Sequence, residues 1–368
     1  MFNPPTPCHI INLDILKQNL KRVSQFKIMA ECEVLLAVKG FSAPYLFDVL
    51  KDTLDGVSAS GLYEARLGYE HFGKYIQTYS PAYREDQIDD VIKYSDAIVF
   101  NSISQLRKYA GKAKQMNCSC GIRVNPLFSE IQKEDANPCR DHSHLGVEIT
   151  TITPEDLRSI EGLHVHAMCE QGAGALERLV KHLIQVFGDD LAQFKWINLG
   201  GGQLIGRQDY DQARAAKCLL ELKKKYNLRV ILEPCEGILS ECGSFATKVL
   251  DIIENDGQIA ILDASPVCHM QDAVFRGWSR AIQGETNEGF SYLLCGQTCF
   301  AGDRFGWYTF ASPLQINDVL FFKDTATYTW VKNNAFNGIP FPTICTYSDD
   351  TGLCVVKEYG YRDFYSIL

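Results

Sequence analysis

Lys39 stands directly after a run of five apolar residues, 34–38, and before a stretch with helical spacing. Five consecutive apolar positions predict a β-strand that is covered on both faces. A lysine at the end of such a strand is expected to be partly desolvated, which lowers the pKa of its ammonium and favours the nucleophilic amine. The position suits a lysine that forms a Schiff base, although strand-end lysines are more often solvated or ion-paired.

Further candidate residues stand at the ends of later apolar runs. His164 and His166 alternate along one run, so both side chains are expected on the same face of a strand. Glu233 ends another run, and three glycines at 200–202 follow a third, where exposed backbone N–H groups would let a phosphate approach. Each feature also has an ordinary structural use: a buried histidine, a tight turn, or a carboxylate paired with a cation such as Arg123.

One scaffold could position these residues, because apolar runs alternate with helical stretches over most of the chain. Eight strands are expected at 33–38, 55–57, 76–79, 97–100, 120–124, 163–166, 196–199 and 230–233. Helices are expected at 44–51, 61–72, 87–94, 104–115, 175–187 and 210–226. Eight strand–helix repeats predict an α/β fold with a (β/α)8 barrel, whose active site lies at the carboxyl ends of the strands. An open, doubly wound sheet is the alternative.

Beyond residue 236 the pattern changes to short strands and turns rich in glycine, asparagine, aspartate and aromatic residues. Strands are expected there at 258–263, 292–295, 307–310, 319–322, 328–331 and 354–357. The sequence therefore predicts two domains, a barrel over residues 10–237 and a β domain built from residues 1–9 and 238–368. Without a low-complexity or proline-rich linker, the two are expected to pack closely.

Composition restricts the class of protein. The 368 residues are 46% hydrophobic and 22% charged, as in globular proteins, and the net charge of −9 argues against nucleic acid or an anionic membrane as partner. No apolar stretch approaches the roughly 18 residues of a membrane span, and a signal peptide is not evident, so a cytoplasmic protein is expected. Fourteen cysteines without compact spacing suit free thiols in a reducing compartment.

Together the candidate residues indicate a site for pyridoxal 5'-phosphate and no metal. A lysine can bind the cofactor's aldehyde, an imidazole can lie flat against its ring, and glycine N–H groups can hold its phosphate. A carboxylate can keep the pyridine nitrogen protonated, and the protonated ring then accepts the electron pair left when a bond at the substrate α-carbon breaks.

Several motifs resemble those of the fold-type III pyridoxal-phosphate decarboxylases, the group of ornithine and diaminopimelate decarboxylase. Within that group the resemblance is strongest to the branch that acts on carboxynorspermidine, and it extends from Thr6 nearly to the C-terminus. The motifs are Ala-Val-Lys-Gly-Phe at 37–41, Phe-Asn-Ser-Ile-Ser-Gln-Leu at 100–106, Leu-Gly-Gly-Gly at 199–202, Leu-Glu-Pro at 232–234, Cys-Gly-Gln-Thr-Cys-Phe-Ala-Gly-Asp at 295–303 and Phe-Asn-Gly at 336–338.

The resemblance implies an alanine-racemase-like barrel followed by a β domain, in a head-to-tail homodimer whose sites each borrow Cys299 and Asp303 from the partner chain. It implies catalytic roles for Lys39, Cys299, Glu233 and His166. The implied cofactor site consists of Lys39, His166, Gly200, Gly201, Gly202, Glu233 and Tyr328, with the Tyr328 hydroxyl on the phosphate. The implied substrate contacts are Asp303, Cys299 and Glu170, and Cys299 would control protonation of the substrate α-carbon. Arg276, which stands where the chain departs from the family pattern, is a further expected substrate contact.

The implied reaction removes the α-carboxylate of a 3-amino-3-carboxypropyl group, converting carboxynorspermidine or carboxyspermidine to norspermidine or spermidine. On the substrate side the chain departs from the family, for example at 143–146, where Ser-Arg-Leu-Gly reads Ser-His-Leu-Gly. A relative that tailors a peptidyl-nucleotide, like the decarboxylase of microcin C maturation, is therefore an alternative. Arg276 and Arg280 would suit such a phosphate-bearing substrate.

Two alternatives come from other classes. A zinc hydrolase on the same barrel would use the closely spaced histidines 164 and 166, or Cys139, His142 and His144. A non-catalytic protein could bind pyridoxal phosphate through Lys39 without a working substrate pocket.

Overall fold

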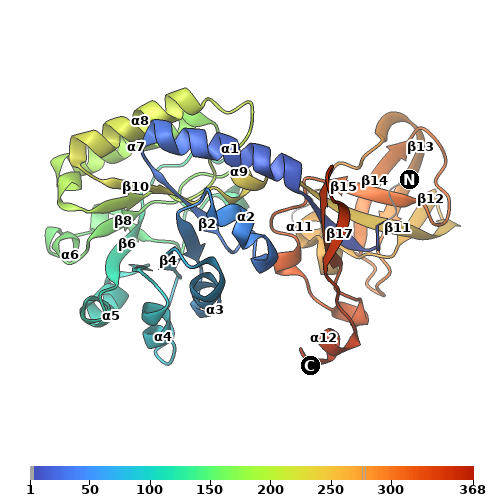
Figure 1. Ribbon diagram of the computed structural model, residues 1–368, viewed down its shortest axis with the longest axis horizontal. Coiled ribbons are helices and arrows are strands. Elements are labelled where there is room, and N and C mark those ends of the chain that lie inside the picture. Colours follow the sequence, from blue (N-terminus) through green and yellow to red (C-terminus); the bar gives the residue numbers. More distant parts are fainter. Residues whose placement is uncertain (1–3, 276, 278) are drawn as a thin grey trace. The chain divides into compact units, whose positions relative to one another are not determined.

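A computed structural model describes residues 4–275, 277 and 279–368, and the chain divides into two compact units (Figure 1). The barrel unit comprises Asn19–Ile238. The sheet unit combines the N-terminal segment up to Gln18 with Leu239–Leu368. Helix α1 (Leu13–Ala30) begins in the sheet unit and ends in the barrel unit.

Parallel strands form a closed ring in the barrel unit. The ring runs in the order β2, β3, β4, β5, β6, β8, β9, β10, and is closed by the pairing of β5 with β6 and of β10 with β2, which excludes the open sheet. The bounds are β2 Glu33–Ala37, β3 Gly56–Ala59, β4 Tyr75–Tyr79, β5 Ala97–Phe100, β6 Ser119–Asn125, β8 Gly162–His164, β9 Trp196–Asn198 and β10 Arg229–Leu232, with the short β7 (Val147–Glu148) beside β6. All eight expected strands are confirmed, with ends that differ by one or two residues.

Helices surround this ring in Figure 1, and each of the six expected helical stretches overlaps one of them. Their bounds are α2 Phe47–Lys51, α3 Leu62–Leu67, α4 Ile88–Lys93, α5 Ile103–Gln115, α6 Pro154–Arg158, α7 Ala173–Phe187, α8 Gln212–Tyr226 and α9 Cys235–Leu239, with a π-helical turn at Gly68–Phe72 and 3-10 turns at Pro44–Leu46, Glu134–Ala136, Ile149–Thr151 and Gly188–Gln193. Helices α1, α6 and α9 were not predicted. In α1, Leu16, Leu20 and Val23 are buried, and the Asn12 side chain caps the first turn by accepting from the backbone N–H of Asp14 at 3.0 Å.

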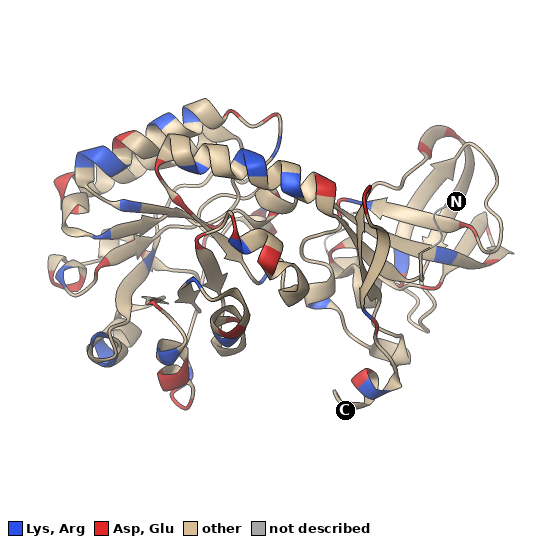
Figure 2. Ribbon diagram, viewed as in Figure 1, with Lys and Arg blue, Asp and Glu red and all other residues tan. Residues whose placement is uncertain are grey.

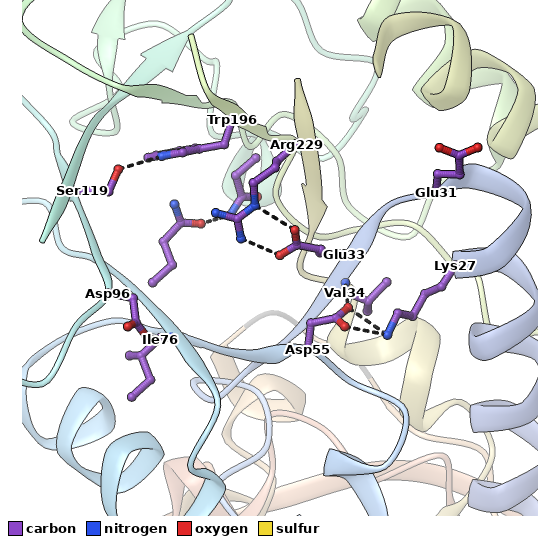
Figure 3. A network of polar contacts seen from close by, with 12 residues as sticks. Lys27, Glu31, Glu33, Val34, Asp55, Ile76, Asp96, Ser119, Trp196 and Arg229 are labelled. Atoms are coloured by element: carbon purple, nitrogen blue, oxygen red, sulfur yellow. Dashed lines mark hydrogen bonds and ion pairs between the residues drawn. The ribbon is translucent and has the colours of Figure 1, made fainter. Parts of the chain in front are cut away.

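Acidic residues at the strand starts tie neighbouring strands together (Figure 3). Asp55, immediately before β3, accepts a hydrogen bond from the backbone N–H of Val34 in β2 at 2.8 Å and forms an ion pair with Lys27 of α1 at 2.8 Å. Asp96, immediately before β5, accepts from the backbone N–H of Ile76 in β4 at 2.8 Å. These side chains extend the strand ladder at the end of the barrel opposite the usual active site, so their role is stability.

The seam between β10 and β2 is held in the same way. Arg229 of β10 makes two hydrogen bonds to the Glu33 carboxylate of β2, at 2.8 and 2.7 Å (Figure 3).

The indole of Trp196 donates to Ser119 Oγ at 3.0 Å and fills the space beside Gly162, where a Cβ would lie 2.0 Å from the indole ring. A large side chain on one strand thus requires glycine on its neighbour.

The sheet unit contains a mostly antiparallel sheet in the order β14, β13, β12, β11, β1, β16, β17, with β15 also paired to β11. Its bounds are β1 Cys8–Asn12, β11 Gly243–Glu254, β12 Gln258–Leu262, β13 Glu285–Cys295, β14 Arg304–Phe310, β15 Val319–Lys323, β16 Thr343–Ser348 and β17 Gly352–Lys357, and its helices are α10 Pro266–His269, α11 Gln271–Phe275 and α12 Tyr361–Tyr365, with 3-10 turns at Trp330–Lys332 and Phe336–Gly338. Strands β1, β11 and β16 were not predicted. The expected strand at 328–331 is wrong, because Tyr328 has a left-handed backbone with φ 56° and a 3-10 turn follows it.

Charge and thiols are spread over both units. Figure 2 shows acidic and basic residues mixed along the helices around the barrel. The fourteen cysteines are free thiols, nine of them buried. Among the described residues, none of the helices is both long and apolar enough to cross a membrane.

Candidate active site

Lys39 lies in the turn that follows β2. This turn is closed by backbone hydrogen bonds from Gly40 N–H to Ala37 O and from Phe41 N–H to Val38 O, both 3.0 Å. The preceding strand is buried, but the turn carries the Lys39 side chain out of it, and the residue is exposed. The expected partial desolvation of its ammonium is therefore wrong for this structure, since exposure of the side chain leaves the amine open to water.

A cavity of about 350 Å³ lies at the carboxyl ends of the barrel strands. Its floor includes Lys39 after β2, Tyr79 at the end of β4, Arg123 in β6 and His166 after β8. A segment that follows β6 supplies another wall, with lining residues Asp135, Ala136, Asn137, Pro138, Arg140, Ser143, His144 and Leu145. The cavity thus occupies the position of the active site in barrels of this type.

His166 is joined to the glycine loop after β9. The sequence predicted His166 at the end of its strand. Strand β8 ends at His164, so His166 lies two residues beyond it. The backbone N–H of Gly201 donates to His166 Nδ1 at 3.0 Å. Burial, with Lys39 and Arg123 nearby, lowers the pKa of His166 well below its usual value, so the imidazole is neutral and its Nδ1 can accept this bond.

The glycine loop has no room for side chains. Gly200 and Gly202 have φ values of +66° and +98°, which favour glycine. A Cβ on Gly200 would lie 2.4 Å from His166 Nδ1, and one on Gly202 would lie 2.4 Å from the carbonyl carbon of Met168. A Cβ on Gly201 would lie 2.6 Å from Glu233 O. The loop therefore presents bare backbone beside the imidazole.

Glu233 follows β10 and is 7% exposed. Asn198 Nδ2 donates to Glu233 Oε1 at 2.6 Å, and His164 Nε2 lies 3.7 Å from Oε2. Burial alone would raise the pKa of Glu233, but His164 and Lys39 outweigh burial and lower the pKa from 4.5 to about 2. The carboxylate is ionised at neutral pH.

Glu233 does not use the cation considered as its partner from the sequence. Among the ion pairs of the described residues, none joins Glu233 to Arg123. The Arg123 guanidinium lies 4.7 Å from the centre of the Tyr79 ring and donates to the backbone carbonyl of His166 at 3.5 Å.

Asn198 and Tyr79 belong to this site but were not recognised in the sequence. Asn198 is fully buried in β9, donates to Gln77 and Glu233, and accepts from the backbone N–H of Gly200 at 2.8 Å. One amide therefore positions both the carboxylate and the glycine loop. A polar residue in the apolar run 196–199, two positions before the first glycine, is the signal that could have revealed it.

Three expected site residues belong to the sheet unit. Cys299 is exposed, and its backbone N–H donates to the side-chain oxygen of Asn337 at 3.4 Å. Asp303 is 3% exposed; its carboxylate accepts from Ser265 Oγ and Thr298 Oγ1, both at 2.7 Å, and also from the backbone N–H groups of residues 298 and 267. These bonds organise the turn that carries Cys299.

Tyr328, also in the sheet unit, is half-buried. The ammonium of Lys332 lies 5.2 Å from the centre of the Tyr328 ring and pairs with Asp272 at 2.7 Å.

The expected substrate residues are less closely grouped. Glu170 is exposed with φ 49°, and the next residue, Gln171, donates its backbone N–H to Gly202 O at 2.8 Å. Arg276 lies outside the described residues, and Arg280 pairs with Asp324 at 3.8 Å. In the described part of the chain, no cluster of three or more histidine, cysteine, aspartate or glutamate side chains is arranged to hold a metal ion.

The groups that the barrel unit brings together suit a planar, phosphorylated aldehyde. Lys39 offers an exposed amine, His166 a neutral imidazole, the glycine loop bare N–H groups and Glu233 a buried carboxylate beside them. This donor set is typical of a site for pyridoxal 5'-phosphate.

Comparison with known proteins agrees with this chemistry. The model of the family "Pyridoxal-dependent decarboxylase, C-terminal sheet domain" matches residues 37–326. The chain is 38% identical to the carboxynorspermidine/carboxyspermidine decarboxylase of Campylobacter jejuni, covering 98% of this chain and 97% of the relative. It is 36% identical to the carboxyaminopropylagmatine decarboxylase of Synechocystis, covering 98% and 94%.

Solved structures give the same result. The crystal structure of the Campylobacter jejuni carboxynorspermidine decarboxylase complexed with norspermidine superposes with a TM-score of 0.92 at 35% identity, covering 99% of this chain and 100% of that one. Diaminopimelate decarboxylase from Helicobacter pylori, complexed with L-lysine, shares the fold with a TM-score of 0.83 at 16% identity, covering 99% and 97%. The resemblance noted in the sequence is confirmed: the chain belongs to the pyridoxal-dependent decarboxylases, which are carbon–carbon lyases.

Proposed function

We propose that this decarboxylase removes the α-carboxylate of a 3-amino-3-carboxypropyl group, and that its substrate is carboxynorspermidine or carboxyspermidine. The products are then norspermidine or spermidine. The observation that carries the proposal is similarity along the whole chain to the Campylobacter jejuni enzyme named for these substrates. The barrel cavity supports it, because the Lys39 amine and the neutral His166 imidazole line one space, and the Glu233 carboxylate is near enough to both for them to lower its pKa.

In this proposal Lys39, His166, Gly200, Gly201, Gly202, Glu233 and Tyr328 hold pyridoxal 5'-phosphate. The cofactor supplies a protonated ring that accepts the electron pair released when carbon dioxide leaves. Lys39 would hold its aldehyde carbon, and the neutral imidazole of His166 would support the ring. The glycine N–H groups and the Tyr328 hydroxyl would bind the phosphate.

Glu233 has the task of keeping a proton on the ring nitrogen. Its pKa of about 2 means that the side chain is a carboxylate throughout the neutral range, and a carboxylate within hydrogen-bond reach raises the pKa of a pyridinium. Asn198 holds one carboxylate oxygen at 2.6 Å, so the other can face the ring. His164 contacts the same carboxylate from the side.

Cys299 has the task of delivering a proton to the substrate α-carbon after carbon dioxide leaves. Its exposure fits a thiol that reaches a neighbouring chain, and we propose a homodimer in which each site takes Cys299 from the partner. The Asp303 carboxylate already accepts four hydrogen bonds, so its task is to hold the turn that carries Cys299 rather than to bind substrate. Glu170 and Arg276 are the proposed contacts for the substrate.

Carboxyaminopropylagmatine is the second candidate substrate. It is favoured by the full-length similarity to the Synechocystis enzyme, which is almost as high. A peptidyl-nucleotide with the same head group is the third, proposed from Arg276 and Arg280.

The test is direct turnover. The cofactor-loaded protein is incubated with carboxynorspermidine, carboxyspermidine and carboxyaminopropylagmatine in turn, and loss of carbon dioxide is followed by mass spectrometry. We expect conversion of the first two at comparable rates, with no conversion by Lys39→Ala. Conversion of the agmatine derivative alone would replace the proposed substrate, and a protein that binds the cofactor and converts none of the three would overturn it in favour of a nucleotide-linked substrate or a non-catalytic role.

A further inference from the structure

The wall of the cavity that follows β6 is a segment of irregular structure. We define the wall segment as residues 133–146, eight of which line the cavity that contains Lys39. Apart from one 3-10 turn at Glu134–Ala136 it has no regular secondary structure. Turn hydrogen bonds within the segment, such as the one from Ser143 Oγ to Pro138 O at 2.6 Å, shape it locally. Without a strand or helix ladder, its position against the barrel depends on contacts with its surroundings, so the groups that fix it matter to the shape of the cavity.

Asn101 fixes the carboxyl end of this segment. It stands directly after β5, in the Phe-Asn-Ser motif whose purpose the cofactor site does not explain. Its Nδ2 donates to the backbone carbonyl of His144 at 2.9 Å, and its Oδ1 accepts from the backbone N–H of Gly146 at 2.6 Å. The Asn101 amide therefore bonds one backbone carbonyl and one backbone N–H of the wall segment, as the backbone of a neighbouring strand would do.

The same oxygen also binds the cavity floor. Asn101 Oδ1 accepts from the Tyr79 hydroxyl at 2.7 Å, and the Tyr79 ring lies under the Arg123 guanidinium at 4.7 Å. Tyr79 and Arg123 both line the cavity, whereas Asn101 does not. One side chain outside the cavity thus joins its wall to its floor.

These partners require an asparagine. A backbone N–H can only donate and a carbonyl can only accept, so the contacts with Gly146 and His144 fix which end of the amide faces which. Aspartate has the same shape but would place an acceptor against the His144 carbonyl. Gly146 itself is held close to β6: it has φ +92°, and a Cβ there would lie 2.9 Å from the backbone nitrogen of Asn125.

We propose that Asn101 is a positioning residue, which holds the wall segment and Tyr79 in the arrangement that admits the amino-acid head of the substrate, without touching substrate or cofactor. The proposal rests on the proposed function only in taking the Lys39 cavity as the reaction site. Asn101 lies on the substrate side, because two of its three partners, Tyr79 and His144, line the cavity, and none of the three belongs to the glycine loop.

The first test compares Asn101→Asp and Asn101→Ala with the wild type and with Ser104→Ala. Ser104 is an exposed neighbour whose hydroxyl contacts that of Ser102, so it is a matched control. We expect kcat/KM to fall by about 10- to 100-fold in both Asn101 variants, mainly through KM, because a displaced wall misplaces the substrate. Cofactor affinity, measured by absorbance titration, should stay within about threefold of wild type. Tyr79→Phe, which removes one bond of the three, should show a smaller loss in the same direction.

Three outcomes of this test overturn the proposal: an unchanged kcat/KM in Asn101→Asp, an equal loss of kcat/KM in Ser104→Ala, or a loss of cofactor affinity in the Asn101 variants that matches their loss of kcat/KM.

A second test does not depend on the substrate and separates this proposal from the proposed function. Lys133 and Arg140 are exposed in the wall segment, so trypsin cleavage after either reports its mobility in the cofactor-loaded protein. We expect faster cleavage at these two sites in the Asn101 variants, and wild-type rates elsewhere in the chain and in Ser104→Ala. Wild-type cleavage rates in the Asn101 variants would overturn the positioning role, even if none of the tested substrates were turned over.

Discussion

His9 and His269 are buried histidines of the sheet unit that differ in their polar contacts. His9 is 1% exposed and lies 4.8 Å from the ring centre of Phe245 and 5.3 Å from that of Trp330. Neither of its nitrogens has a hydrogen-bond partner among the residues that the structure describes. His269 accepts from the backbone N–H of Ser265 at 3.3 Å and contacts the carbonyl of Pro340 at 3.2 Å. Burial lowers the pKa of His9 to about 3 and that of His269 to about 4.

The contrast predicts opposite effects of the same substitution. His9→Leu should raise the free energy of unfolding by about 1 kcal/mol at pH 7.5, because it removes two unsatisfied buried polar atoms, and His269→Leu should lower it by a similar amount. Below pH 6.5 the unfolded chain gains protons that folded His9 does not bind, so wild-type stability falls as pH decreases from 6.5 towards 3. His9→Leu should flatten this decline in urea unfolding curves measured between pH 7.5 and 5, and a decline as steep as wild type would contradict the assignment.

Lys39 gives the second prediction at this scale. Lys39→Ala should abolish the visible absorption band that arises when the cofactor aldehyde is bound to a lysine, while free cofactor still binds weakly at the glycine loop. The control is Lys93→Ala, an exposed lysine of α4. A wild-type spectrum in Lys39→Ala would mean that another amine, and not Lys39, binds the cofactor aldehyde.

The glycine loop after β9 is the element on which the cofactor site depends most. Gly200→Ala combines a left-handed φ with a Cβ 2.4 Å from His166 Nδ1, so it should displace the imidazole and weaken binding of pyridoxal 5'-phosphate by at least about tenfold. Gly172→Ala, at the N-terminal end of α7 with open space around its Cβ position, should bind normally. Fluorescence titration with the cofactor measures both, and equal affinities would remove the steric argument.

The helices and strands differ in how well they could be predicted from the sequence. The barrel strands were predictable because most of their residues are buried and because short, mainly apolar runs alternate with helical stretches, although polar residues such as Gln77 and Arg123 interrupt some of the runs. The strand expected at 328–331 was predicted because its β-branched and aromatic residues have high strand propensity. The prediction was wrong because the left-handed backbone of Tyr328 is incompatible with a strand. Helix α1 was missed although its buried leucines recur at helical spacing.

The site was predictable to the same extent and for a similar reason. Lys39, His166 and Glu233 stand one or two residues after barrel strands, where position along the chain already implies position in a barrel. The roles of Asn198 and Asn101 depend on partners far away in sequence, such as Glu233 and Gly146, and no local pattern contains that information.

The assembly gives a prediction for the whole molecule. If each site combines Lys39 of one chain with Cys299 of its partner, mixing inactive Lys39→Ala and Cys299→Ala proteins should restore up to about a quarter of wild-type activity, through one intact site in each mixed dimer. Each variant alone, treated identically, is the control. Absence of recovery after demonstrated subunit exchange would mean that each site is built within one chain.

The hydrogen bonds that Asp55 and Asp96 accept from neighbouring strands bear on the order in which the chain folds. They join residues only 21 and 20 positions apart, so each new strand can lock onto a recently made neighbour while synthesis continues. Strand β1 is made earlier than all the barrel strands, yet its partners are residues 243–246 and 343–347. We expect the barrel unit to fold progressively while it is synthesised on the ribosome. Strand β1 must wait, with an unpaired and aggregation-prone edge, until residues 243–246 and 343–347 have emerged.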